Sequence, residues 1–175
     1  MKSEIKTALI FGIIIATGLG IISMVFSSFD DEFVSTNITS EGNSITKIDK
    51  SGFKIAPDLV GIAHYLNTTP EKLSEEIKDK VILYDIWTYS CINCIRTLPY
   101  ITAWDDKYAE HGLLIIGVHS PEFEFEKDPE NVKMAIEKYG ISYPVVLDND
   151  METWKAFDNR YWPRKYIADH EGYIR

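Results

Sequence analysis

The stretch that decides the fold is "YDIWTYSCINCIRTLP", residues Tyr84–Pro99. It holds both cysteines of the chain, Cys91 and Cys94, with two residues between them. The preceding run is almost wholly apolar and contains a single carboxylate, Asp85. Such a run predicts a short strand buried on both faces, and the residues after Cys91 predict a helix. We therefore expect the two cysteines at a junction of strand, turn and helix.

The sequence around this junction predicts strands that alternate with helices. We expect strands at 80–87, 113–119 and 143–148 and a final hairpin with its turn at 169–172. We expect helices at 92–110, kinked or restarted at Pro99, and at 150–157. A further helix should begin at Pro70 after a Thr69 cap, and another should begin at 128–131 and stop at Gly140. This order of elements predicts a small α/β sandwich.

Composition limits the classes of protein that the chain can belong to. It has 175 residues, of which 45% are apolar and 13% aromatic, so it can build a core and is not globally disordered. The formal net charge is -9. Binding to nucleic acid needs a basic face that neutralises phosphates, so we expect no nucleic-acid partner.

The N-terminal part of the chain predicts export. Residues 7–26, "TALIFGIIIATGLGIISMVF", carry no charge. As a helix they would span about 30 Å, the thickness of one hydrocarbon core. Lys2 and Lys6 precede this segment, so the positive-inside rule places residues 1–6 in the cytoplasm and the remainder outside. A cleaved signal peptide is the alternative to a transmembrane anchor. Both interpretations place the domain outside the cytoplasm.

Two further segments complete the predicted organisation. Residues 27–50 are polar and without helical or strand periodicity, which is typical of a flexible linker. Residues 51–175 hold the alternating elements and form the predicted domain. The protein is thus predicted to be a single-pass protein of the cell membrane with an extracytoplasmic domain.

Three interpretations compete for Cys91 and Cys94. A structural metal site needs about four ligands, and the chain has no second Cys-x-x-Cys pair. A structural disulfide across two residues closes almost no loop and so gains little entropy. A redox-active dithiol is favoured, because the N-terminal end of a helix stabilises a thiolate. Cys91 would then attack the sulfur of a partner, and Cys94, on the same helix face, would resolve the mixed disulfide.

Four segments together resemble one family. "VILYDIWTYSCINCIRTLPYI", "GVHSPEFEFEKD", "YPVVLDND" and "NRYWPRKYIAD" are similar to the thioredoxin-like superfamily, in particular to extracytoplasmic thiol–disulfide oxidoreductases of the TlpA/DipZ type. The resemblance covers about residues 56–175. It implies a three-layer α/β/α sandwich with a mixed central sheet. It also implies no cofactor beyond the redox-active disulfide Cys91–Cys94.

The resemblance also implies roles for individual residues. Asp85 matches a buried carboxylate beneath the active site, whose pKa burial without a partner would raise, so that it accepts and returns the proton of Cys94. The alternative is a strand-end aspartate in a polar loop contact. Trp87 matches an aromatic residue that packs beside the dithiol. Pro163 matches a cis-proline opposite the dithiol, where the backbone of Trp162 would pair with an extended substrate.

The sequence departs from the family pattern in two places. Many TlpA-like reductases carry a glutamate three residues after the second cysteine, where this chain has Thr97, so the role of that carboxylate is not transferred. Family members also continue past Arg175 with the remainder of an edge strand and a final helix. We therefore expect that the domain is truncated at its C-terminus, or that a partner covers the gap.

The predicted function is a membrane-anchored thiol–disulfide oxidoreductase. The resemblance favours the reducing direction, with protein disulfides or thiols as substrates and a membrane electron donor of the CcdA/DsbD type. A Cu(I)-binding or metal-delivery module and a redoxin-like thiol peroxidase are the alternatives. Residues 119–122 either reach the rim of the active site or form a solvated loop. The acidic segment 122–130 either steers a basic partner or is a solvated surface.

Overall fold

The computed structural model describes residues 49–175. The predicted cytoplasmic segment, the membrane segment and all but the last two residues of the predicted linker lie outside the described residues. None of the helices in the described part is both long and apolar enough to cross a membrane.

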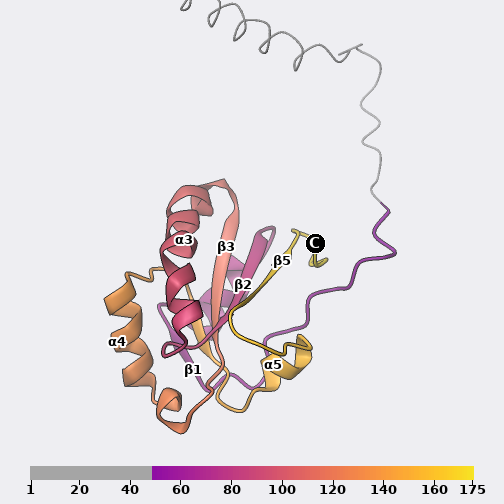
Figure 1. The fold of residues 1–175 in the computed structure, drawn as a ribbon. Coiled ribbons are helices and arrows are strands. Elements are labelled where there is room, and N and C mark those ends of the chain that lie inside the picture. The colour runs from indigo at the N-terminus through magenta and orange to yellow at the C-terminus, as the bar shows by residue number, and fades with distance from the viewer. Residues whose placement is uncertain (1–48) are drawn as a thin grey trace, which may run out of the picture. The chain divides into compact units, whose positions relative to one another are not determined.

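The described residues form a small α/β domain (Figure 1). In chain order its elements are β1 (His64–Leu66), α2 (Pro70–Glu76), β2 (Val81–Trp87), α3 (Ile92–Tyr108), η1 (Ala109–His111), β3 (Leu113–His119), η2 (Glu124–Lys127), α4 (Pro129–Tyr139), β4 (Val145–Leu147), α5 (Glu152–Ala156) and β5 (Arg164–Ala168).

The five strands make one mixed sheet in the order β1-β4-β3-β2-β5. β2, β3 and β4 are parallel, whereas β1 and β5 join the two edges in the antiparallel direction. The central strands are buried on both faces, which explains their almost continuous apolar sequences. The predicted mixed central sheet is confirmed.

Helices cover both faces of this sheet. α3 and α4 lie together on one side, and α5 lies on the other (Figure 1). Alternate residues of β2 divide between two cores: Leu83 and Trp87 pack with Leu98 of α3, whereas Ile82 and Tyr84 pack with residues from α2 and the end of α5. We call these two sides of the sheet the α3 face and the α5 face. The predicted three-layer sandwich is confirmed.

Local signals place most helix ends correctly. The hydroxyl of Thr69 accepts a hydrogen bond from the N–H of Lys72 and caps α2, as predicted. α4 ends at Gly140, whose φ of +64° is a conformation that glycine adopts without strain. α3, however, continues through Pro99 to Tyr108, so the predicted restart of the helix is wrong.

The remaining differences lie at the edges of the sheet. β1 was not predicted, because three residues are too few to show a period. β4 is shorter than the predicted strand at 143–148. The predicted final hairpin is confirmed: after β5 the chain turns, and Ile174 bridges back to Ala168.

Candidate active site

The two cysteines lie at the N-terminal end of α3. Cys91 is the N-cap residue, and its Sγ accepts a hydrogen bond from the backbone N–H of Cys94 at 3.4 Å. Cys91 is partly exposed, whereas Cys94 is completely buried, and both are free thiols. The predicted junction of strand, turn and helix is therefore confirmed. Cys91, the predicted attacking thiol, is the more exposed of the two.

The environment of Cys94 disfavours its thiolate. Burial is the main cause that raises the pKa of the Cys94 thiol, and the neighbouring Cys91 side chain and the charge of Asp85 raise it further. Cys94 therefore needs a proton acceptor before it can act as a nucleophile.

Asp85 lies in the middle of β2, on the α3 face. Its side chain is fully buried, and burial raises the pKa of its carboxyl group. The ammonium of Lys165 opposes this rise, because its Nζ lies 2.5 Å from Oδ1 of Asp85. The expected burial without a partner is therefore wrong. The alternative of a strand-end residue in a loop contact is also wrong, because Asp85 pairs in register with Gly117 of β3 and Lys165 of β5.

Trp87 ends β2 two residues beyond Asp85 and is fully buried in the same core cluster as Cys94. Its ring meets that of His119 edge-on, with centroids 5.3 Å apart. Its packing depends on Gly117, since a Cβ at that position would lie 3.1 Å from Nε1 of Trp87 and equally close to Cγ2 of Val145. Trp87 thus belongs to the wall beside the buried thiol.

The peptide bond between Trp162 and Pro163 is cis, as predicted. Trp162 packs against the core cluster that contains Cys94, and its Nε1 donates a hydrogen bond to the carbonyl of Ser120 at 3.0 Å. Its ring also packs on Trp154, with centroids 4.2 Å apart. These contacts fix the loop before β5 on neighbouring elements.

The end of β3 and the segment after it support the cysteine turn. For His119 this agrees with the alternative that residues 119–122 reach the active site, whereas the role of Glu126 was not predicted. His119, Ser120 and Glu126 are completely buried, so the interpretations of 119–122 as a solvated loop and of 122–130 as a solvated surface are wrong for these residues. The backbone N–H of Tyr89 donates to Nε2 of His119 at 3.3 Å, and the hydroxyl of Ser90 donates to Oε1 of Glu126 at 2.5 Å. Both residues therefore hold the segment that leads into Cys91.

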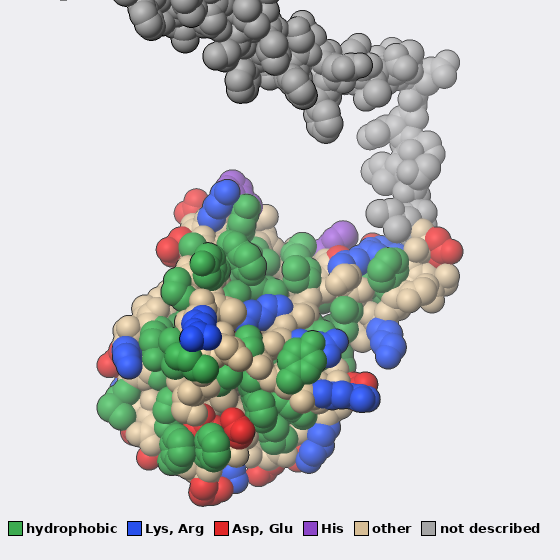
Figure 2. All heavy atoms as spheres, in the orientation of Figure 1, with side chains coloured by type: hydrophobic (Ala, Val, Ile, Leu, Met, Phe, Trp, Pro, Cys, Tyr) green, Lys and Arg blue, Asp and Glu red, His purple; other side chains and the backbone are tan. Residues whose placement is uncertain are grey.

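Exposed apolar side chains gather on the side of the molecule that carries α3 and η2 (Figure 2). Ile92 of α3, next to Cys91, is 57% exposed. Phe123 and Phe125 are also exposed and stack on each other at 5.5 Å, and Phe125 contacts Tyr89 of the cysteine turn. Exposed apolar side chains therefore lie beside the accessible thiol and beside the cysteine turn, with exposed Glu124 between the two phenylalanines.

This arrangement provides the parts of a dithiol–disulfide cycle. One thiol is accessible and receives an N–H hydrogen bond at a helix end, and the second is buried three residues further on, near a carboxylate. Within residues 49–175, no group of three or more His, Cys, Asp or Glu side chains is placed to hold a metal ion.

Comparison with known proteins agrees with this site. The model of the Redoxin family matches residues 50–175. Protein DipZ of Mycobacterium bovis is 48% identical over 122 residues, which are 69% of this chain but only 18% of DipZ. Thiol-disulfide oxidoreductase YkuV of Bacillus subtilis is 33% identical over 121 residues, or 68% of this chain and 79% of YkuV.

A solved structure supports the same assignment. The solution structure of a thioredoxin-like protein in its oxidised form is 32% identical, with a TM-score of 0.62 over 70% of this chain and 82% of that one. The expected resemblance is therefore confirmed in fold and in sequence. The chain belongs to the Redoxin family, among the thioredoxin-like thiol–disulfide oxidoreductases.

Proposed function

We propose that the protein is a membrane-anchored thiol–disulfide oxidoreductase that works outside the cytoplasm through Cys91 and Cys94, in the reducing direction. The observation that carries the proposal is the asymmetry of the two thiols. Cys91 is accessible and accepts the N–H of Cys94, whereas Cys94 is completely buried beside Asp85. A partner would reach the first sulfur only, which supports this order of the two steps.

The cycle balances without a further reactant. The Cys91 thiolate attacks one sulfur of a substrate disulfide and forms a mixed disulfide, and the other substrate sulfur leaves as a thiolate that takes up a proton. Cys94 then gives its proton to Asp85 and attacks Sγ of Cys91. The Cys91–Cys94 disulfide forms, and the second substrate sulfur leaves as a thiolate. The substrate gains two electrons, and the dithiol loses them.

The location and the partners rest on other features. The uncharged segment 7–26, with lysines before it, supports a membrane anchor and an exported domain. The apolar surface formed by Ile92, Phe123 and Phe125 next to Cys91 supports protein substrates over small thiols. An exported dithiol needs a source of electrons across the membrane, and a membrane donor of the CcdA/DsbD type supplies them in this proposal.

Two cysteine variants test the exchange chemistry. The full-length chain, kept in detergent, is reduced and mixed with a protein that carries one accessible disulfide. We expect Cys91→Ser to lose all exchange, and Cys94→Ser to accumulate a stable mixed disulfide that mass spectrometry assigns to Cys91. If Cys94→Ser turned over substrate as fast as the natural sequence, the two-step mechanism would be wrong.

A redox titration tests the direction. The fraction of oxidised Cys91–Cys94 is measured by thiol trapping in glutathione or dithiothreitol buffers. A midpoint near the thioredoxin value of about -270 mV supports a reductant, whereas one near about -120 mV identifies an oxidant and contradicts the proposed direction.

A further inference from the structure

Two exposed phenylalanines lie beside the cysteine turn. Phe123 and Phe125 are 48% and 55% exposed, and their rings stack with centroids 5.5 Å apart and an angle of 6° between the planes. The ring of Phe125 also meets that of Tyr89 at 6.2 Å, and its carbonyl oxygen accepts the Tyr89 hydroxyl at 3.2 Å. We call the two side chains the phenylalanine ridge. Exposed aromatic groups of this kind are typical of the anchors of protein interfaces.

A buried carboxylate fixes the ridge relative to the accessible thiol. Glu126 is completely buried, and its Oε2 accepts the backbone N–H groups of Glu122 at 2.6 Å and of Phe123 at 2.9 Å. Its Oε1 accepts the hydroxyl of Ser90, the residue directly before Cys91. One side chain thus joins the ridge to the cysteine turn. A surface held in this way loses little conformational entropy when a partner binds.

The surface around the ridge is acidic. Four carboxylate side chains of the segment 122–130 are exposed, namely Glu122, Glu124, Asp128 and Glu130. Lys127 is the one basic residue of this segment, and its ammonium pairs with Glu124 at 2.8 Å. Four negative charges against one positive charge leave an excess of three negative charges beside the ridge. Figure 2 shows acidic side chains next to apolar ones on this part of the surface.

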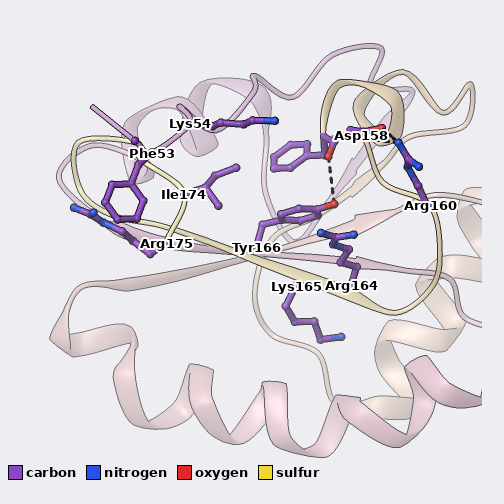
Figure 3. Close-up of a pocket in the computed structure, with 11 residues that line it drawn as sticks. Phe53, Lys54, Asp158, Arg160, Arg164, Lys165, Tyr166, Ile174 and Arg175 are labelled. Atoms are coloured by element: carbon purple, nitrogen blue, oxygen red, sulfur yellow. Dashed lines mark hydrogen bonds and ion pairs between the residues drawn. The ribbon is translucent and has the colours of Figure 1, made fainter. Parts of the chain in front are cut away.

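Basic side chains gather at a different place. Figure 3 shows Lys54, Arg160 and Arg164 around a pocket at β5. The exposed ring of Phe53 lies at the same pocket, and its centroid is 4.3 Å from Cζ of Arg175. Cations therefore surround this pocket, whereas a partner that docks at the ridge meets aromatic rings and carboxylates.

We propose that the phenylalanine ridge and the carboxylates around it bind the substrate segment, and that they favour protein disulfides with an apolar residue and an arginine or lysine close to the cysteine. The proposal rests on the exchange through Cys91 proposed above and names the substrate class of that site. It also takes up the expectation that the segment 122–130 meets a basic partner.

The chemistry of the surface matches such a segment. An apolar side chain of the substrate packs on the phenylalanine rings, and a guanidinium or ammonium group interacts with the faces of the rings and with the carboxylates beside them. The same carboxylates repel an acidic segment, so the surface discriminates as well as binds. Ile92, which is 57% exposed next to Cys91, extends the apolar contact to the reacting sulfur.

The test compares two synthetic peptides that share one internal disulfide. Both carry a leucine near the cysteines, and one carries an arginine where the other carries a glutamate. Reduced full-length protein in detergent is mixed with each peptide, and oxidation of Cys91 and Cys94 is followed by thiol trapping. One turnover reduces the peptide disulfide to two thiols and oxidises the protein dithiol. At low salt we expect the arginine peptide to react about tenfold faster, and high salt should reduce this ratio towards one.

A first pair of variants tests the aromatic part of the surface. Replacing both rings, Phe123→Ala with Phe125→Ala, should raise the half-saturating concentration of the arginine peptide by about tenfold and lower the maximal rate much less. Phe53→Ala is the matched control, because it removes an exposed ring at the basic pocket. It should leave both quantities unchanged.

A second pair tests the charges. Glu122→Gln with Glu124→Gln should lower the preference for the arginine peptide to about twofold or less at low salt. The control is Glu71→Gln with Glu75→Gln, which removes two exposed carboxylates from α2 on the α5 face. The control should keep the preference of the natural sequence.

The outcomes separate this proposal from the underlying function. If the two peptides react equally at low salt, or if Phe53→Ala raises the half-saturating concentration as much as the loss of the ridge, the proposal is wrong although exchange persists. If loss of the ridge converts a dimer into a monomer and leaves the half-saturating concentration unchanged, the ridge is a contact between two copies, and the proposal is again wrong. If the natural sequence oxidises with neither peptide and forms no mixed disulfide at Cys91, the proposed function itself fails.

Discussion

The two faces of the sheet differ in what they bury. The α3 face encloses Asp85, Cys94 and His119, which are ionisable groups with no exposure to solvent. The α5 face packs an aromatic trio, in which Phe157 lies with its ring centroid 5.0 Å from both Tyr84 and Tyr166. Burial of ionisable groups costs stability, and burial of apolar rings supplies it. The comparison indicates that both faces hold the fold, whereas the α3 face also carries the chemistry.

The largest expected effects are losses of stability from deletions in the two cores, which should differ in their effect on the thiols. Phe157→Ala on the α5 face should lower the free energy of unfolding by about 3–5 kcal/mol, and Leu98→Ala on the α3 face by about 2–5 kcal/mol. Only Leu98→Ala should also change the reactivity of the thiols, because Leu98 packs in the cluster that contains Cys94. Urea unfolding and the rate of alkylation measure the two properties. If Phe157→Ala changed the rate of alkylation as much as Leu98→Ala, the two faces would not differ in their effect on the thiols.

The next effect concerns pH. Burial lowers the pKa of His119 from 6.5 to about 4, so the unfolded chain takes up this proton at a higher pH than the folded one. Protonation of this histidine therefore favours the unfolded chain. The free energy of unfolding is not reduced by this effect above pH 6.5, and it falls by up to about 3 kcal/mol as the pH decreases towards 4. His119→Gln should therefore flatten the fall of stability over this window in urea titrations. If the free energy of unfolding of His119→Gln falls by the same amount over this pH range, a group other than His119 causes the fall.

A smaller effect is expected at Gly117. An added methyl group would lie 3.1 Å from both Trp87 and Val145, so Gly117→Ala should cost about 1–3 kcal/mol and shift the fluorescence of the displaced indole. Gly52 is the matched control, because a Cβ there meets nothing within 4 Å. Similar stabilities of the two variants would show that the wall beside Cys94 is loosely packed.

The smallest effect is expected at Thr97. Thr97→Val removes the hydroxyl between Lys165 and the Cys94 carbonyl and should cost about 1 kcal/mol. Thr102→Val is the control, since that hydroxyl donates only to carbonyls of its own helix. If urea unfolding shows that Thr102→Val costs as much stability as Thr97→Val, the contact between Thr97 and Lys165 adds no stability.

The sequence predicted the parts of the fold that depend on local signals. The buried strands β2 and β3, the cap at Thr69 and the stop at Gly140 all follow from patterns within a few residues. The spacing of Cys91 and Cys94 at the start of a helix was sufficient to group the two thiols, and the resemblance to the thioredoxin-like superfamily added Asp85 and Trp87 from the same stretch. The predicted restart at Pro99 was wrong, because α3 is long and packed enough to continue through this proline.

The sequence by itself therefore determined where the two thiols lie and which of them is accessible, because a strand followed by a helix end fixes both. Tertiary structure alone decided what surrounds them. Lys165 meets Asp85 only through the register of β5 on β2, and Glu126 meets Ser90 only through the fold of the loop after β3. Both contacts join residues far apart in the chain, and the register of a sheet is set by packing on both of its faces rather than by the composition of either segment.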